Sequence, residues 1–344
     1  EEAINANAIY KSGIVNRHSL DDRESKFNIL HLENRDLTWE KMYELNIGAE
    51  LGLFDNRIST TLDIYQRNTF DLIDLVRTSG VGGQYYKYAN FGDMRTRGIE
   101  LGIHTKNIVT EDFKWSTSLT VSAMDQKITR LLNSPNAFDM VAGRGRGNIV
   151  DYPRGSLFSF NFQGLNNQGL PTFDFGRYPS NQSELSKIAG ADFLDAQYAK
   201  SYLIYHGPIE PRVIGGLSNT LKYKNWELSF FLTVQAGNKI RLNPTFDPEF
   251  ADLNIFSKSY YNRWLNPGDE YKTDVPVLPS QELIAAVGKE NIERAYNTYD
   301  YSQQRVADGS FVRMKNISLA YTVPENFLKK IRLHSMNLNL NLTN

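Results

Sequence analysis

Apolar and polar side chains alternate with a period of two over segments of about ten residues. In the clearest segment, 43–53, the odd positions are all apolar, whereas the even positions are mostly polar or small. Successive side chains of a strand point to opposite faces, so the pattern predicts strands with one apolar and one wet face. Comparable segments lie at 58–65, 98–104, 115–123, 213–223 and 226–236. Further strands are predicted at 156–162, 311–321 and 336–342.

The connections between these strands are alternately short and long. Turns at 54–57, 106–112 and 224–225 join the predicted strands into three hairpins. Long stretches at 68–93, 125–155, 163–211 and 237–309 separate the hairpins. Transmembrane barrels have this asymmetry, and strands of about ten residues suffice to cross a bilayer. The chain is therefore predicted to be all-β, part of a transmembrane antiparallel β-barrel with long extracellular loops.

The strand ends carry aromatic side chains, as the interfacial girdles of membrane barrels do. These residues are Tyr43, Phe54, Tyr65, Phe113, Trp115, Tyr223, Trp226 and Tyr321. On the predicted apolar faces, nine side chains are expected to contact lipid. They are Leu45, Ile47, Leu51, Ile99, Leu101, Leu119, Val121, Leu228 and Phe230. In a soluble β-rich binding or adhesion protein, the alternative that the pattern leaves open, these side chains would instead be buried beneath a second layer.

The composition argues against several other classes of protein. A mean hydropathy of -0.45 and the lack of any apolar run near 18 residues argue against membrane-spanning helices. The formal net charge of -1 gives no support to nucleic-acid binding. The chain has no cysteine, which excludes disulfides, cysteine-ligated zinc and thiol nucleophiles.

Histidine is the side chain most often found in catalytic and metal sites. The five histidines show no spacing typical of a metal site, so neither a catalytic residue nor a metal site is predicted, and the chain is not expected to be an enzyme. An outer-membrane enzyme with an active site at the barrel rim stays open as an alternative. It would need an Asp–His or Ser–His cluster within hydrogen-bond reach. A structural calcium ion at Asp247, Glu249 and Asp252 is a weaker expectation, and no other cofactor is predicted.

Some residues of the wet faces and loops could recognise a ligand. Glu100 and His104 are predicted to line a lumen, whereas aromatic and basic side chains occur in long loops. The loop candidates are Tyr85, Tyr86, Tyr88, Arg144 and Arg146. Residues 281–296 have an irregular helical pattern and are expected to pack on an extracellular loop.

Several motifs in sequence order resemble one family. They include 37–41, followed by 54–58 and 69–73; Asn90-Phe91-Gly92-Asp93-Met94 through Gly98-Ile99-Glu100; and Pro153-Arg154-Gly155-Ser156. Later ones are 211–216, Arg263-Trp264-Leu265-Asn266-Pro267-Gly268-Asp269 and 308–319. Together they resemble the barrel of the SusC/RagA-like TonB-dependent transporters of Bacteroidota, and the resemblance covers nearly all of the chain from Leu37 onward.

The resemblance implies a fold, a location and a function. Residues 1–344 would be a single segment of a 22-stranded plugged barrel in the outer membrane of a Gram-negative bacterium, with the N-terminal plug and the terminal strands outside it. The implied function is TonB-dependent active import of a bulky nutrient, a glycan or an oligopeptide. The implied partners are a SusD-like surface lipoprotein, TonB with its inner-membrane motor, and outer-membrane lipid.

Overall fold

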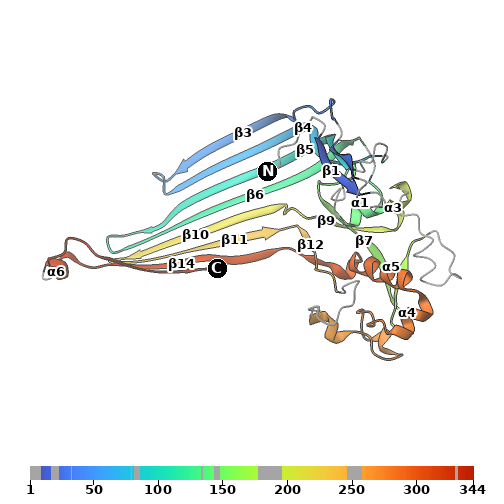
Figure 1. The fold of residues 1–344 in the computed structure, drawn as a ribbon. Coiled ribbons are helices and arrows are strands. Elements are labelled where there is room, and N and C mark those ends of the chain that lie inside the picture. Colours follow the sequence, from blue (N-terminus) through green and yellow to red (C-terminus); the bar gives the residue numbers. More distant parts are fainter. Residues whose placement is uncertain are drawn as a thin grey trace.

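The main element of the computed structural model is an open eight-stranded antiparallel sheet (Figure 1). The structure describes residues 9–16, 23–31, 33–78, 80, 86–132, 135–142, 148–176, 196–245, 258–329 and 332–344. In sheet order the strands are β3 (Lys41–Leu53), β4 (Ile58–Arg77), β5 (Tyr86–Val109), β6 (Phe113–Leu131), β10 (Val213–Tyr223), β11 (Trp226–Ala236), β14 (Phe311–Thr322) and β15 (Asn337–Thr343). The partial barrel predicted from the sequence is confirmed.

The three predicted hairpins are present as β3–β4, β5–β6 and β10–β11. Their turns lie at one end of the sheet, and the long connections gather at the other end (Figure 1). In the first turn Phe54, Asp55 and Asn56 all have positive φ angles, between 54° and 59°. This run of left-handed residues reverses the chain within a few positions.

Strand register places the alternating side chains on two distinct faces. One cross-strand row runs Ala49, Leu62, Leu101, Val121, Gly215 and Val234. The neighbouring row on the opposite face runs Gly48, Asp63, Glu100, Ser122, Ile214 and Gln235. All nine side chains predicted to contact lipid lie on the first face, and none of them is buried. We call the two faces the apolar face and the polar wall.

The hairpin β4–β5 is longer than predicted. Residues 68–93 were expected to be a loop, but β4 and β5 remain paired as far as Arg77 and Tyr86. A small core stabilises the extension: Leu72, Val76, Ala89 and Phe91 are buried together. These contacts join residues from different strands, so they leave no signal in the local period of either segment.

The long connections after β6 and after β11 fold together into one unit, which we call the cap. Its three-stranded sheet comprises β7 (Ser156–Leu165), β8 (Pro171–Asp174) and β9 (Leu203–Pro208). The segment 156–162 was predicted as a further strand of the barrel; instead it lies in the cap as β7. Most of β7 is buried, including Phe158, Phe160 and Phe162. A strand buried on both faces can belong to a core rather than to a barrel wall.

Helices from both connections pack into the core of the cap. The first contributes α1 (Ala137–Ala142) and α3 (Ala196–Tyr202), and the second α4 (Gln281–Val287) and α5 (Lys289–Asp300). The predicted helix at 281–296 is thus two helices, because Gly288 between them has φ 92°, which only glycine adopts without strain. Phe162 and Tyr299 join the connections: their ring centroids lie 5.5 Å apart.

Smaller elements complete the fold. A separate hairpin comprises β1 (Ile9–Asn16) and β2 (Arg23–His31), and β12 (Lys239–Arg241) pairs with β13 (Val306–Asp308). The 3-10 helices are η1 (Lys258–Asn262), η2 (Asp269–Tyr271) and η3 (Gln303–Arg305), and α6 (Glu325–Leu328) lies between β14 and β15. In the part of the chain that the structure describes, no helix combines the length and the apolar character needed to span a bilayer.

Candidate functional site

The polar wall carries the two lumen residues predicted from the sequence. Glu100 and His104 project from β5 on this face, because they share the parity of the row that contains Asp63 and Ser122. His104 Nδ1 lies 2.8 Å from Ser118 Oγ on the neighbouring strand. Both predicted residues are exposed, so they can contact a molecule in front of the sheet.

Two open hollows lie along this wall. One has a volume of about 530 Å³, and its lining includes Glu50, His104 and Ser118. The other has a volume of about 440 Å³, and its lining includes Asp63, Glu100 and the exposed apolar side chains Ile214 and Phe231. Hollows with mixed polar and apolar linings suit ligands that carry both kinds of group.

Carboxylates gather on one side of the polar wall. Glu44 accepts a hydrogen bond from Arg67 Nε at 2.7 Å, and the Arg67 guanidinium lies 5.0 Å from the centroid of the Tyr65 ring. Asp63 and Glu100 occupy directly opposite positions on β4 and β5, and neither forms an ion pair within the described part of the chain. This side of the wall therefore has a negative potential.

One predicted girdle residue has a different role. Tyr65 lies on the polar wall and is only 8% exposed, so the expectation that it belongs to an interfacial girdle was wrong. It lies opposite Gly98, and a Cβ atom at position 98 would be 2.3 Å from the Tyr65 ring. The glycine leaves the space that the Tyr65 ring occupies.

The structure describes two of the five loop residues predicted to contact a ligand. Tyr88 in β5 is 39% exposed. Tyr86 begins the same strand, whereas Tyr85 lies outside the described residues. Arg144 and Arg146 also lie outside the described residues, as do the predicted calcium ligands Asp247, Glu249 and Asp252. The described residues include no group of three or more acidic or histidine side chains that could hold a metal ion.

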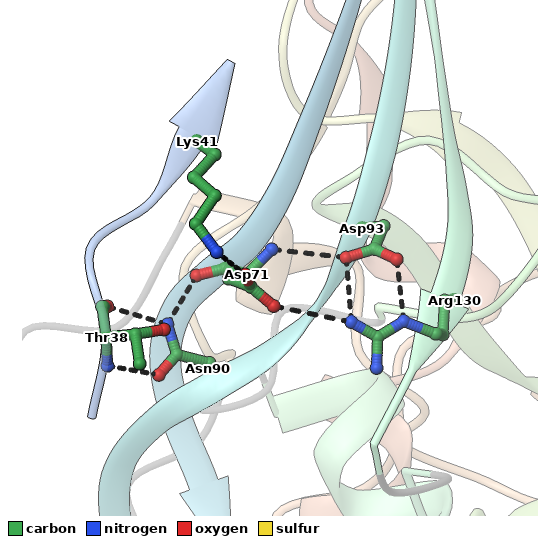
Figure 2. A network of polar contacts seen from close by, with 6 residues as sticks. All are labelled: Thr38, Lys41, Asp71, Asn90, Asp93 and Arg130. Atoms are coloured by element: carbon green, nitrogen blue, oxygen red, sulfur yellow. Dashed lines mark hydrogen bonds and ion pairs between the residues drawn. The ribbon is translucent and has the colours of Figure 1, made fainter. Parts of the chain in front are cut away.

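A polar network joins β3 to β6 where the sheet meets the long connections. Figure 2 shows its six residues: Thr38, Lys41, Asp71, Asn90, Asp93 and Arg130. Arg130 binds Asp93 through two hydrogen bonds of 2.6 and 3.0 Å. Lys41 Nζ donates to Asp71 Oδ2 at 3.1 Å, and Arg130 Nη2 lies 3.5 Å from Asp71 Oδ1. We call these six residues the rim network.

The rim network surrounds a bulge in β4. Asp71 has a positive φ of 57°, and the β4–β5 register shifts on either side of Leu72. A bulge leaves backbone groups without ladder partners, and here side chains replace those partners. Asp93 accepts from the Asp71 N–H at 3.1 Å, and Asn90 donates to the Asp71 carbonyl at 2.6 Å. Glu40 accepts from the Ile73 N–H at 2.7 Å.

The sequence did not predict this network, although five of its six residues stood in recognised motifs: Thr38 and Lys41 in 37–41, Asp71 in 69–73, and two more in the next motif. Asn90 and Asp93 both belong to the segment Asn90-Phe91-Gly92-Asp93-Met94. Asn90 contacts Thr38 across 52 positions of sequence, and Asp93 contacts Arg130 across 37 positions. A motif can mark such residues, but only the fold identifies what they bind.

Two serine–histidine contacts bear on the enzyme alternative. Besides His104 and Ser118, His206 Nε2 lies 2.6 Å from Ser159 Oγ in the cap. Ser159 is fully buried, so no substrate can reach it. The pKa of His206 is lowered by burial and by the cations Arg241 and Lys239. No carboxylate bonds to either histidine within the described residues, so neither pair has the orienting third group of a nucleophilic triad.

The class of protein follows from the two faces and the cap. An antiparallel sheet with an exposed apolar face, a polar wall and turns gathered at one end is part of the wall of a transmembrane β-barrel.

Comparison with known proteins identifies the family. Residues 5–344 match the model of the TonB dependent receptor-like β-barrel family, and the chain belongs to this family. It is 28% identical over 324 residues to TonB-dependent receptor P3 of Formosa agariphila, covering 89% of this chain and 29% of that protein. It is also 28% identical over 216 residues to TonB-dependent receptor SusC of Bacteroides thetaiotaomicron, covering 60% of this chain and 20% of that protein.

Solved structures agree on the fold. The RagAB peptide transporter matches with a TM-score of 0.69 at 22% identity, over 98% of this chain and 35% of the transporter chain. The RagAB peptide importer in its open-open state matches with a TM-score of 0.62 at 20% identity, covering 99% of this chain and 35% of that one. The SusC/RagA-like resemblance and the outer-membrane location in a Gram-negative bacterium are thus confirmed, and the relatives are receptors rather than enzymes. The chain spans about a third of the length of the proteins it matches.

Proposed function

We propose that this chain forms part of the barrel of a transporter that imports a bulky nutrient by TonB-dependent active transport. The observation that carries the proposal is the separation of a mostly apolar face from a mostly polar wall across the strands from β3 to β11. A barrel of this kind encloses a wet lumen inside an oily surface. In this account the plug and the remaining strands lie outside residues 1–344, and the chain is one continuous segment of the barrel domain.

The apolar face contacts outer-membrane lipid. Its nine predicted side chains stand between aromatic residues at both ends of the strands. At the turn end, Phe113, Tyr223, Trp226 and Tyr321 occupy a single cross-strand row. At the other end, the rings of Tyr43 and Phe70 lie 5.8 Å apart. From Tyr43 to Leu53 a strand rises about 33 Å, or about 25 Å once tilted by about 40°, which equals the apolar band of such barrels.

The polar wall lines the import path. Glu100 and His104 are proposed to contact cargo as it crosses the lumen, and the two hollows provide room beside them. Tyr88, together with Tyr85, Tyr86, Arg144 and Arg146, is proposed to contact cargo at the cap end. Aromatic faces can stack on sugars or pack against peptide side chains, so a glycan and an oligopeptide both fit this set.

The proposed partners follow from the relatives. SusC and RagAB suggest that a SusD-like surface lipoprotein covers the cap end and that TonB with its inner-membrane motor acts on a plug outside residues 1–344. RagAB is described as a peptide transporter, which makes oligopeptides one of the two cargo classes to test.

Uptake by the full-length protein tests the proposal. Cells that express it would be grown on defined glycans or oligopeptides as the sole nutrient, with and without functional TonB. We expect growth on one cargo class, lost when TonB or the plug is removed although the barrel remains in the outer membrane. Equal growth without TonB would contradict the proposal.

A further inference from the structure

The turn that carries α6 differs from the other turns of the sheet. The hairpin turns at 54–57 and 224–225 are short, whereas residues 323–336 separate β14 from β15. The turn is held by its own backbone: Val323 N–H donates to the Met336 carbonyl at 3.0 Å, and Leu333 N–H donates to the Leu328 carbonyl at 3.1 Å. Leu328 is only 1% exposed. The described residues of the turn, 323–329 and 332–336, are therefore held together by backbone hydrogen bonds and by the buried side chain of Leu328.

The same turn exposes large apolar side chains. Phe327, next to the anchor, is 67% exposed, and Leu333 is 48% exposed. Met336 has the same parity as Leu338, Leu340 and Leu342 of β15, so the apolar face of the sheet continues into the turn. Exposed apolar groups that extend a lipid-facing surface favour contact with the membrane interface.

The turn also carries cations. Lys329 and Arg332 are exposed, and neither forms an ion pair within the described part of the chain. At the other turns the cations are engaged: Lys224 Nζ lies 3.7 Å from Asp112, and Arg57 donates to the Asn107 carbonyl at 3.1 Å. Against these cations and the adjacent Lys330, residues 323–336 contain one acidic residue, Glu325. The turn therefore has a net positive charge.

Its position in the fold brings these groups to headgroup level. The turn follows directly on the aromatic row, through Tyr321 and its cross-strand partner Leu338. Figure 1 shows α6 beyond the ends of the other strands, at the end of the sheet opposite the cap. Aromatic girdles lie at the headgroup boundary, so groups just beyond the row reach the phosphates.

We propose that the α6 turn binds anionic phospholipids in the leaflet on the turn side of the membrane. Lys329 and Arg332 contact the phosphate groups, and Phe327 and Leu333 enter the boundary between headgroups and acyl chains. Positive charge selects for anionic headgroups, and the apolar side chains hold the turn at the interface. This inference rests on the outer-membrane orientation given under the proposed function.

Lipid retention by the purified full-length protein tests the inference. The protein would be equilibrated in detergent micelles containing equal amounts of phosphatidylglycerol and phosphatidylethanolamine, and native mass spectrometry would count the lipids that remain bound. We expect the parent to prefer phosphatidylglycerol. The variant Lys329→Glu with Arg332→Glu should reduce this preference by about fivefold for each cation replaced.

A matched variant controls for net charge. Lys200→Glu with Lys258→Glu makes the same charge change on the cap and should keep the preference. Lys329→Arg with Arg332→Lys keeps the charge of the turn and should also keep it. An unchanged preference in the charge-reversed variant, in a barrel that still shows heat-modifiable gel mobility, would overturn the inference and leave the proposed function intact. Failure of the parent to insert into membranes would instead contradict the proposed function.

Discussion

Asn90 binds the backbone of Thr38 through both ends of its side-chain amide. The Thr38 N–H donates to Asn90 Oδ1 at 2.8 Å, and Asn90 Nδ2 donates to the Thr38 carbonyl at 2.9 Å (Figure 2). This pairing imitates a rung of a β-ladder across 52 residues of sequence. The same Nδ2 also donates to the Asp71 carbonyl, so one side chain joins the segment before β3 to the bulge of β4.

Asn90→Ala should destabilise the rim network without unfolding the barrel. The change removes all three of these hydrogen bonds and leaves backbone groups without partners, at a cost of about 1–3 kcal/mol. Hydrogen exchange should become faster at residues 37–40 and around Asp71 and remain unchanged in β10 and β11. An equal increase in the exchange rate across the whole sheet would contradict a local role for Asn90.

Gly98→Ala should destabilise the sheet, because the added methyl group would overlap the ring of Tyr65. Moving a ring that is 8% exposed is expected to cost about 1–3 kcal/mol, measured as a lower urea midpoint for unfolding. Gly13→Ala is the control, since its Cβ would meet nothing within 4 Å. Adding Tyr65→Ala should recover part of the loss at position 98; no recovery would mean that the ring is not the cause.

The cap should be more stable in mild acid than at neutral pH. Asp300 is buried at the end of α5, and burial raises its pKa from 3.8 to about 6. Its folded pKa exceeds its unfolded pKa, so its contribution is complete below about pH 4 and is lost as the pH rises through about 6, by about 3 kcal/mol. Proteolysis of the cap at pH 5 and pH 7.5 measures the part of this loss that falls between those pH values, about 1.4 kcal/mol.

Asp300→Asn provides the control for the pH effect. The amide can still accept the hydrogen bond that the Thr245 N–H donates at 2.8 Å, but it cannot ionise. The variant should resist proteolysis equally at both pH values. If its pH dependence equals that of the parent, another group is responsible.

An added charge should destabilise the protein on one face of β6 and have little effect on the other. Val121 lies on the apolar face, and Val121→Arg should cost about 2–4 kcal/mol near the membrane midplane. Ser122 lies on the polar wall directly opposite Glu100, so Ser122→Arg gains a partner and should be almost neutral. Urea unfolding of both variants in lipid vesicles provides the comparison, and equal losses would argue against the assignment of faces.

The sequence predicted the parts of the fold that depend on local pattern. The period of two identified the apolar faces of β3 and β11, because each residue's face follows from its neighbours alone. The same parity correctly placed Glu100 and His104 on the polar wall. The hairpin signals located the turns at 54–57 and 224–225 for the same reason.

The predictions that were wrong or incomplete concern features that depend on residues distant in sequence. β7 alternates from Phe158 to Gln163 and was predicted as a strand, but its place in the cap depends on contacts between two separate connections. The extension of β4–β5 is stabilised by a small core and by the rim network, and its bulge interrupts the regular pairing. Tyr65 looked like a girdle residue, but it shares the face of Asp63, and the space that its buried ring occupies depends on a glycine in the next strand.

The separation of the two faces is the central claim, and spin-label accessibility tests it most directly. Single cysteines at the adjacent positions 100 and 101 of β5, placed in the full-length protein with any cysteine outside residues 1–344 replaced, can each carry a nitroxide in vesicles. Position 101 should be relaxed mainly by oxygen dissolved in lipid, and position 100 by a water-soluble nickel complex. Equal exposure of both positions to the nickel complex would contradict the account.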